Sequence, residues 1–101
     1  MNRALPSMEL SESLANLRRS LILEVAELSV LVRGTQPPAD EVRVVIHRSV
    51  HRLAGGLGFF GLRDEGEIAR VIDVSLSTDT EKWPIDELLD LLRSIERLLL
   101  P

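Results

Sequence analysis

The chain of 101 residues contains no cysteine. This absence excludes disulfide bonds, thiolate metal sites and catalysis by a cysteine nucleophile. An excess of basic residues is also lacking, because 12 Lys and Arg residues stand against 16 Asp and Glu residues, for a formal net charge of -4. This balance gives no electrostatic reason to expect a nucleic-acid partner.

Long apolar runs are missing as well. The opening segment MNRALPSMEL has no apolar stretch of the length found in signal peptides, and no segment reaches the roughly 20 apolar residues of a membrane-spanning helix. We therefore expect a cytoplasmic protein with no membrane partner. The hydrophobic share of 45% and the charged share of 28% are those of an ordinary globular protein. A chain of this length has room for one domain.

Apolar residues recur at helical spacing in four segments, and no stretch keeps a two-residue alternation for long. The predicted helices run from about Ser11 to Arg33, from Pro38 to Phe60, from Leu62 to Leu76, and from Pro84 onward. Short loops between successive helices favour antiparallel neighbours. The sequence therefore predicts an all-α fold, an antiparallel up-down-up-down four-helix bundle that forms one domain over residues 1–101. Residues 1–10 are expected to be a loosely ordered N-terminal tail.

Each predicted helix presents one apolar stripe to the expected core. In chain order the stripes contain Leu14, Leu17, Leu21, Val25, Leu28 and Leu31 (or Val32); Val42, Ile46, Ser49, Leu53, Leu57 and Phe60; Leu62, Ile68 (or Ala69), Ile72 and Leu76; and Ile85, Leu88, Leu89, Leu92, Ile95 and Leu99. The last segment has three further leucines, Leu91, Leu98 and Leu100, which leave room for dimerisation. The expected state is a monomer or a weak homodimer.

The second predicted helix ends in HRLAGGLGFFG, residues 51–61, although each glycine inside a helix costs about 1 kcal/mol relative to alanine. Gly56 lies on the flank of the core face, where the close approach of a neighbouring helix would explain it. Gly55 and Gly58 lie on the outward face with His51, where core packing does not explain them. Because helical side chains lean toward the N-terminus, a side chain at position 55 would cover His51. We therefore expect these glycines to leave the imidazole open to another macromolecule.

This stretch resembles the signature of histidine phosphotransfer (HPt) domains. In that family a helix of a four-helix bundle carries a histidine, any one residue, a hydrophobic residue, a lysine, a glycine and a small residue, with a further glycine six residues after the first. The matching residues are His51, Leu53, Gly55, Gly56 and Gly61. The glycine run is also similar to the phosphotransfer domain of chemotaxis-type histidine kinases. The four-helix pattern agrees over nearly the whole chain, but Ala54 stands where the family has lysine.

The resemblance implies that His51 is the phosphoacceptor of a two-component phosphorelay. Its neutral imidazole would take a phosphoryl group from a response-regulator receiver domain or from a histidine kinase, and return it to a receiver aspartate. The chain would be a carrier rather than an independent kinase, without a cofactor of its own, because Mg²⁺ is expected in the receiver partner only. Arg48 is placed to supply the missing positive charge. The expected docking residues are His47, Arg52, Gly55, Gly58 and Phe59.

Other interpretations stay open at this stage. His47 and His51 have the i, i+4 spacing of a zinc pair, but HRSVH lacks the glutamate that follows the first histidine in metalloprotease helices, and no third ligand is apparent. We therefore expect no metal. A catalytically silent HPt-like bundle that binds a receiver or a kinase as an inhibitor or adaptor is supported by Ala54. A plain dimeric bundle with a structural role would bury the His51 face against a second copy.

Overall fold

The computed structural model describes residues 7–34, 36–78 and 83–99. Within these ranges the chain forms four α-helices, one short 3-10 helix and no β-strand. The elements are α1 (Ser7–Val32), α2 (Asp40–Gly56), η1 (Leu57–Phe60), α3 (Arg63–Thr78) and α4 (Ile85–Leu99). The predicted all-α class is confirmed. No helix of the described residues is long and apolar enough to cross a membrane.

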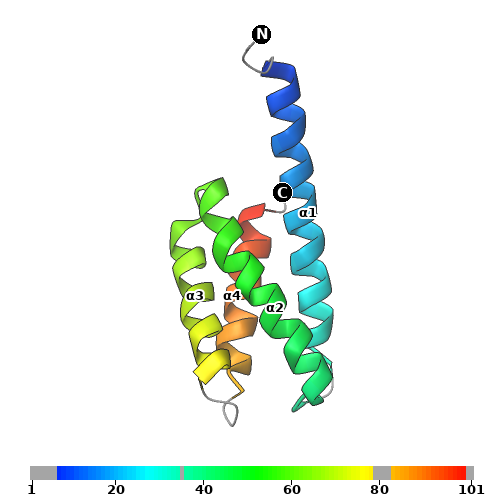
Figure 1. Cartoon of the computed structure of the whole chain (residues 1–101), viewed down its shortest axis with the longest axis vertical. Helices are drawn as coiled ribbons and strands as arrows, with labels where there is room; N and C mark the ends of the chain where they lie inside the picture. The colour runs from blue at the N-terminus through cyan, green and yellow to red at the C-terminus, as the bar shows by residue number, and fades with distance from the viewer. Residues whose placement is uncertain (1–6, 35, 79–82, 100–101) are drawn as a thin grey trace.

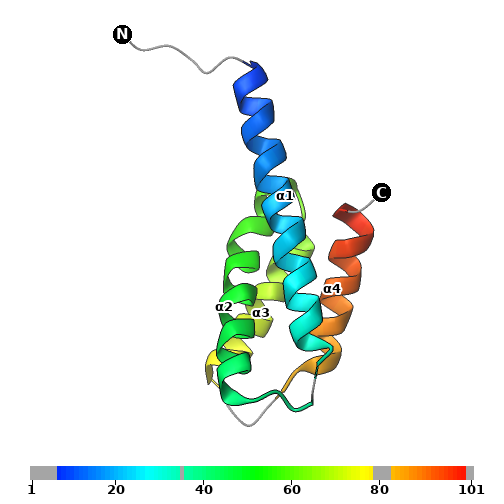
Figure 2. The same cartoon turned by 90° about the vertical axis from the view of Figure 1, so that its right-hand side faces the viewer.

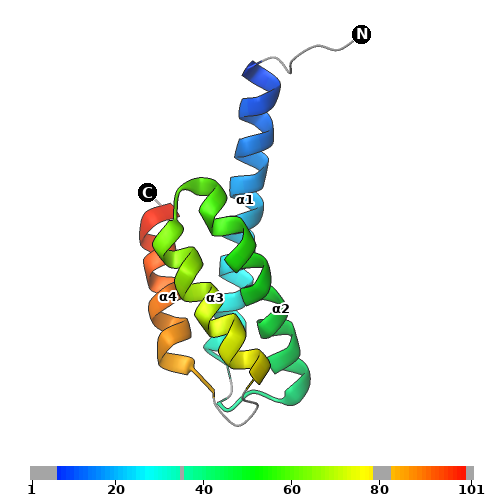
Figure 3. The ribbon, with the colours of Figure 1, turned by 60° about the vertical axis from the view of Figure 1, so that its left-hand side comes forward.

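The helices pack against one another as in a bundle. α2 contacts both α1 and α3, and α4 contacts the same two helices. Figures 1 and 2 show that the end of α1, the start of α2, the end of α3 and the start of α4 lie at one end of the molecule. At the other end α1 extends well past its neighbours, as Figure 3 shows from a third direction. The α2 and α3 pair, joined by η1, carries the candidate site.

The second predicted helix is divided in two. Asp40 and Glu41 lie in the first turn of α2, where the helix dipole favours negative charge. After Gly56 the chain tightens into η1, because glycine has a low α-helix propensity. η1 ends at Gly61, whose φ of 78° is left-handed, and the N–H of Gly61 donates to the carbonyl of Gly58. Gly61 therefore ends this helical segment, as the sequence predicted.

Some helix boundaries differ from the sequence prediction, most of all at the start of the first helix. α1 begins at Ser7 rather than Ser11, so residues 7–10 of the predicted tail are helical, and residues 1–6 lie outside the described residues. Gly34, the predicted end of the first helix, follows α1 without a positive φ. α3 continues two residues past Leu76.

The core is a single apolar cluster to which all four helices contribute. Its buried members are Leu21, Val25, Leu28, Val32, Ile46, Val50, Leu53, Leu57, Ala69, Ile72, Leu76, Leu88, Leu91, Leu92, Ile95 and Leu99. Most of these belong to the predicted stripes, and where two residues were open, Val32 and Ala69 are the buried ones. Leu91 is core rather than a dimer surface, because only 2% of it is exposed. Leu98 is 54% exposed, and Leu100 lies outside the described residues.

Two predicted core residues are wrong. Leu14 and Leu17 are 40% and 49% exposed. The N-terminal part of α1 extends past the other described helices (Figure 1), and Leu17 lines an open groove with Phe59 and Phe60 instead of joining the packed core. Trp83, which precedes α4, is partly buried against the core, and its indole N–H donates to the side chain of Gln36.

Candidate functional site

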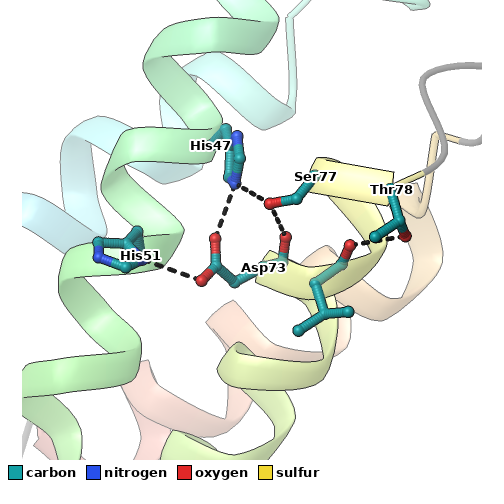
Figure 4. A network of polar contacts seen from close by, with 6 residues as sticks. His47, His51, Asp73, Ser77 and Thr78 are labelled. Carbon is teal, nitrogen blue, oxygen red and sulfur yellow. Dashed lines mark hydrogen bonds and ion pairs between the residues drawn. The ribbon is translucent and has the colours of Figure 1, made fainter.

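Two histidines of α2 meet one carboxylate of α3 (Figure 4). His47 Nε2 lies 2.7 Å from Asp73 Oδ1, and His51 Nδ1 lies 2.9 Å from Asp73 Oδ2. Asp73 follows the buried Ile72, so its side chain emerges at the edge of the α2 and α3 interface, where it is 16% exposed. The three residues form what we call the His47–Asp73–His51 cluster.

Ser77, one turn after Asp73, completes the cluster. Its Oγ donates to the backbone carbonyl of Asp73 at 2.9 Å and lies 3.0 Å from His47 Nε2. Because the hydroxyl hydrogen is directed at that carbonyl, the Ser77 oxygen is free to accept from His47 Nε2. His47 therefore carries its hydrogen on Nε2, where both Ser77 and Asp73 can accept it.

The ionisation of Asp73 decides the hydrogen positions. Burial raises the pKa of Asp73, but hydrogen bonds from His51 and His47 and attraction to their rings outweigh this effect, so the pKa falls below its ordinary value of 3.8. Asp73 is thus a carboxylate at neutral pH and can only accept hydrogen bonds. The nitrogen that faces it must carry the hydrogen, which for His51 is Nδ1. A neutral His51 ring then has its lone pair on Nε2.

The two histidines differ in exposure. The His51 side chain is 76% exposed, whereas the His47 side chain is 34% exposed. Figure 4 shows the second ring nitrogen of His51 directed away from Asp73. His51 is therefore on the open face, as predicted. His47 was expected there too, but the contacts with Asp73 and Ser77 draw it toward α3.

The space around the outward glycines is open. A Cβ placed on Gly55 or on Gly58 would meet no neighbouring atom within 4 Å, so the fold itself does not require glycine there. The same holds for Gly56, and the predicted close approach of a neighbouring helix at this position is wrong. The glycine in contact with another element is Gly66 of α3, where a Cβ would lie 3.6 Å from the Cβ of Leu57.

Of the other predicted site residues, the structure brings Arg48 and Arg52 together with the two histidines. A surface hollow between α2 and α3 is lined by His47, Arg48, His51, Arg52, Asp73 and Ser77. Arg48 is exposed and makes no hydrogen bond or ion pair with the described residues. Arg52 is turned toward α1, where its Nε lies 2.6 Å from Glu24 Oε1. Phe59 is 74% exposed and lines a separate groove beside α1.

Sequence reasoning missed Asp73 and Ser77. The available signal was their i, i+4 spacing in the third predicted helix, which matches the spacing of His47 and His51 in the second. Each also directly follows a predicted core residue, Ile72 or Leu76, which places it on the flank of the core stripe.

Among the residues for which the structure gives positions, no group of three or more His, Cys, Asp or Glu side chains could hold a metal ion. The chain was compared with protein-family models, with curated proteins and with solved structures, and no match was found. The chemistry of the His47–Asp73–His51 cluster is therefore the main guide to function.

Proposed function

We propose that this chain is a histidine phosphotransfer protein of a two-component phosphorelay, built as an antiparallel up-down-up-down bundle, and that His51 carries the phosphoryl group. The observation that carries this proposal is the 2.9 Å hydrogen bond between His51 Nδ1 and Asp73 Oδ2, made by a side chain that is 76% exposed. The resemblance of HRLAGGLGFFG to the HPt signature supports it.

The hydrogen bond to Asp73 selects the attacking atom. With its hydrogen held on Nδ1, His51 presents the Nε2 lone pair to the phosphorus of an aspartyl phosphate on a receiver domain. The nitrogen–phosphorus bond forms as the phosphorus–oxygen bond to that aspartate breaks, and the aspartate leaves as a carboxylate. The reverse reaction returns the phosphoryl group. Asp73 keeps the Nδ1 hydrogen bond in both directions and stabilises the positive charge that the ring gains.

Charge neutralisation and positioning supply the rest of the catalysis. Mg²⁺ is expected to come with the receiver. Arg48, with its exposed guanidinium on the rim of the same hollow, is the cation that this chain would contribute to the phosphoryl oxygens. The docking residues are His47, Arg52, Gly55, Gly58 and Phe59. Since Phe59 lines a separate groove, we expect the smallest docking effect from it.

A second candidate is a catalytically silent HPt-like bundle that binds a receiver or a kinase as an inhibitor or adaptor. The observation in its favour is Ala54, which is partly buried against the core and provides no cation where HPt domains have lysine. The two candidates differ in one property, which is whether His51 accepts a phosphoryl group.

The deciding experiment incubates the chain with acetyl-phosphate-charged receiver domains and Mg²⁺ and follows the intact mass. We expect one added phosphoryl group that is acid-labile and base-stable. His51→Gln should abolish it, and the matched variant His47→Gln should retain it. A receiver that binds the wild-type chain without transferring phosphate would support the silent bundle instead. Phosphorylation that persists in His51→Gln would contradict both candidates.

A further inference from the structure

Among the residues that the structure describes, no helix lies beside the N-terminal part of α1 (Figures 1 and 2). The Arg18 guanidinium donates to the carbonyl of Leu99, the last residue of α4, and so marks the level at which α4 ends. The preceding residues Ser7–Leu17 extend beyond the other helices, as Figures 1–3 show from three directions. We call this segment the α1 overhang.

The α1 overhang continues the apolar stripe of the core. Inside the bundle the stripe is buried, with Leu21 8% exposed, but Leu17 is 49% and Leu14 is 40% exposed. Leu14, Leu17 and Leu21 are spaced three and four residues apart. This is the a and d spacing of a coiled-coil seam, which indicates that another helix covers it.

An apolar groove lies at the base of the α1 overhang. It is lined mainly by Leu17, Leu21, Leu53, Gly56, Phe59 and Phe60. Leu17 belongs to both the seam and the groove, so the two surfaces are continuous. Gly56 adds no side chain to fill the groove, and Phe59 is 74% exposed on its wall. The seam and the groove together form one mainly apolar surface, to which Ser20, Glu24 and Arg52 add polar groups in the groove.

The charges of the α1 overhang and the turn that follows favour a second, antiparallel copy as that helix. Glu12 lies within the overhang, whereas Arg18 and Arg19 follow directly after it. Two antiparallel copies bring Glu12 of one toward the arginines of the other. A parallel pair would set like charges side by side.

We propose that two copies of this chain dimerise through antiparallel α1 overhangs, with the first turns of each α1 lying over the groove of the other copy. In an antiparallel seam an a position faces a d position, which places Leu14 of one copy opposite Leu17 of the other. His51 remains open in this dimer, because it faces the α3 side of α2 whereas the groove faces α1 (Figure 4). The dimer does not require phosphotransfer, but its groove includes Arg52 and Phe59, which are also expected docking residues.

Cysteine cross-linking tests the arrangement, and the absence of native cysteine keeps the experiment clean. Leu14→Cys and Leu17→Cys chains are oxidised separately and as a mixture. We expect the mixed disulfide to form faster than either symmetrical one, because identical positions are offset by three residues, about 4.5 Å along the helix. Faster symmetrical disulfides would indicate a parallel pair and overturn the proposal. Val30→Cys, exposed on α1 away from the overhang, is the control.

Analytical ultracentrifugation of the full chain at increasing concentration tests the dimer itself. We expect the wild type to reach twice the monomer mass, and Leu17→Glu and Phe59→Ser to remain at the monomer mass. Val30→Glu, which adds the same charge at a residue that is 74% exposed, should behave like the wild type. Circular dichroism confirms that each variant is folded. A wild-type chain that stays monomeric at every concentration would overturn the proposal.

Discussion

On each side of α2, a carboxylate from the neighbouring helix accepts hydrogen bonds from two α2 side chains, but the side chains differ. On the α1 side, Glu24 Oε1 accepts from Ser49 Oγ at 2.9 Å and from Arg52 Nε at 2.6 Å. On the α3 side, Asp73 accepts from His47 and His51. In both cases one carboxylate of a neighbouring helix binds two α2 side chains that lie about one helical turn apart.

The chemical outcome differs because of what each donor retains. Ser49 is buried with its hydroxyl engaged, and an arginine has no lone pair to offer. An imidazole that donates through one nitrogen keeps a lone pair on the other. The contacts of Glu24 therefore only hold α2 against α1, whereas those of Asp73 also prepare His51 Nε2 for attack. The α3 side is therefore reactive because its donors are histidines, and not because its hydrogen bonds are arranged differently.

The largest expected effect is on the rate of phosphotransfer, when the carboxylate on the α3 side is neutralised and the carboxylate on the α1 side serves as the control. Asp73→Asn removes the charge that holds the hydrogen on His51 Nδ1, so we expect phosphotransfer from a charged receiver to slow about 10- to 100-fold, as when other partners that orient an imidazole are lost. Glu24→Gln should leave the rate unchanged. Rapid-quench measurement of the phosphorylated chain checks both. Equal rates in the two variants would mean that the two sides do not differ in function.

The next effect concerns access to His51. Gly55→Leu places a side chain over the His51 turn, and we expect transfer from the receiver to slow about 10-fold or more, because docking geometry is disturbed. Phosphorylation by a small donor such as phosphoramidate should be unaffected. Gly56→Leu, on the α1 side, is the matched control and should slow the receiver reaction less, because it lies in the groove with Arg52 and Phe59 rather than over His51. If Gly55→Leu slows both donors equally, the glycine serves the chemistry rather than docking.

The contrast between these sites was partly predictable from the sequence. Helical periodicity is a local property, so it identified the four helices, most of the core and the open position of His51. It did not identify Asp73, because which flank of the third helix faces α2 depends on how the helices pack. For the same reason it placed Leu14 and Leu17 in the core, since periodicity shows which face is apolar but not where neighbouring helices end.

A smaller effect is expected on the free energy of unfolding when a glycine on either side of α2 is replaced by alanine, and it should be the same on both sides. Neither Gly55 nor Gly56 has a neighbour that a Cβ would meet within 4 Å, so alanine at either position should stabilise the fold by about 0.5–1 kcal/mol. Gly61→Ala should instead destabilise it by about 1 kcal/mol, because its φ of 78° is strained for alanine. Urea unfolding measures all three. Destabilisation by Gly55→Ala would contradict the open space seen there.

The smallest effect is the pH dependence of stability on the α3 side. The pKa of Asp73 is lowered in the folded state, so its contribution to the free energy of unfolding is present above its ordinary value of 3.8 and is lost as the pH falls through the lowered pKa. The wild type and Asp73→Asn should therefore differ at neutral pH and converge in acid. Urea unfolding across this range measures the difference. A difference that grows as the pH falls below 3.8 would contradict the lowered pKa of Asp73.

The most direct test of the central claim is NMR spectroscopy of the His51 ring nitrogens, before and after phosphorylation by a charged receiver. We predict that the neutral ring carries its hydrogen on Nδ1 and that the phosphoryl group appears on Nε2. In Asp73→Asn the preference for the Nδ1 hydrogen should weaken. A phosphoryl group on Nδ1, or none on His51 with any receiver, would contradict the claim that Asp73 prepares Nε2 as the phosphoacceptor.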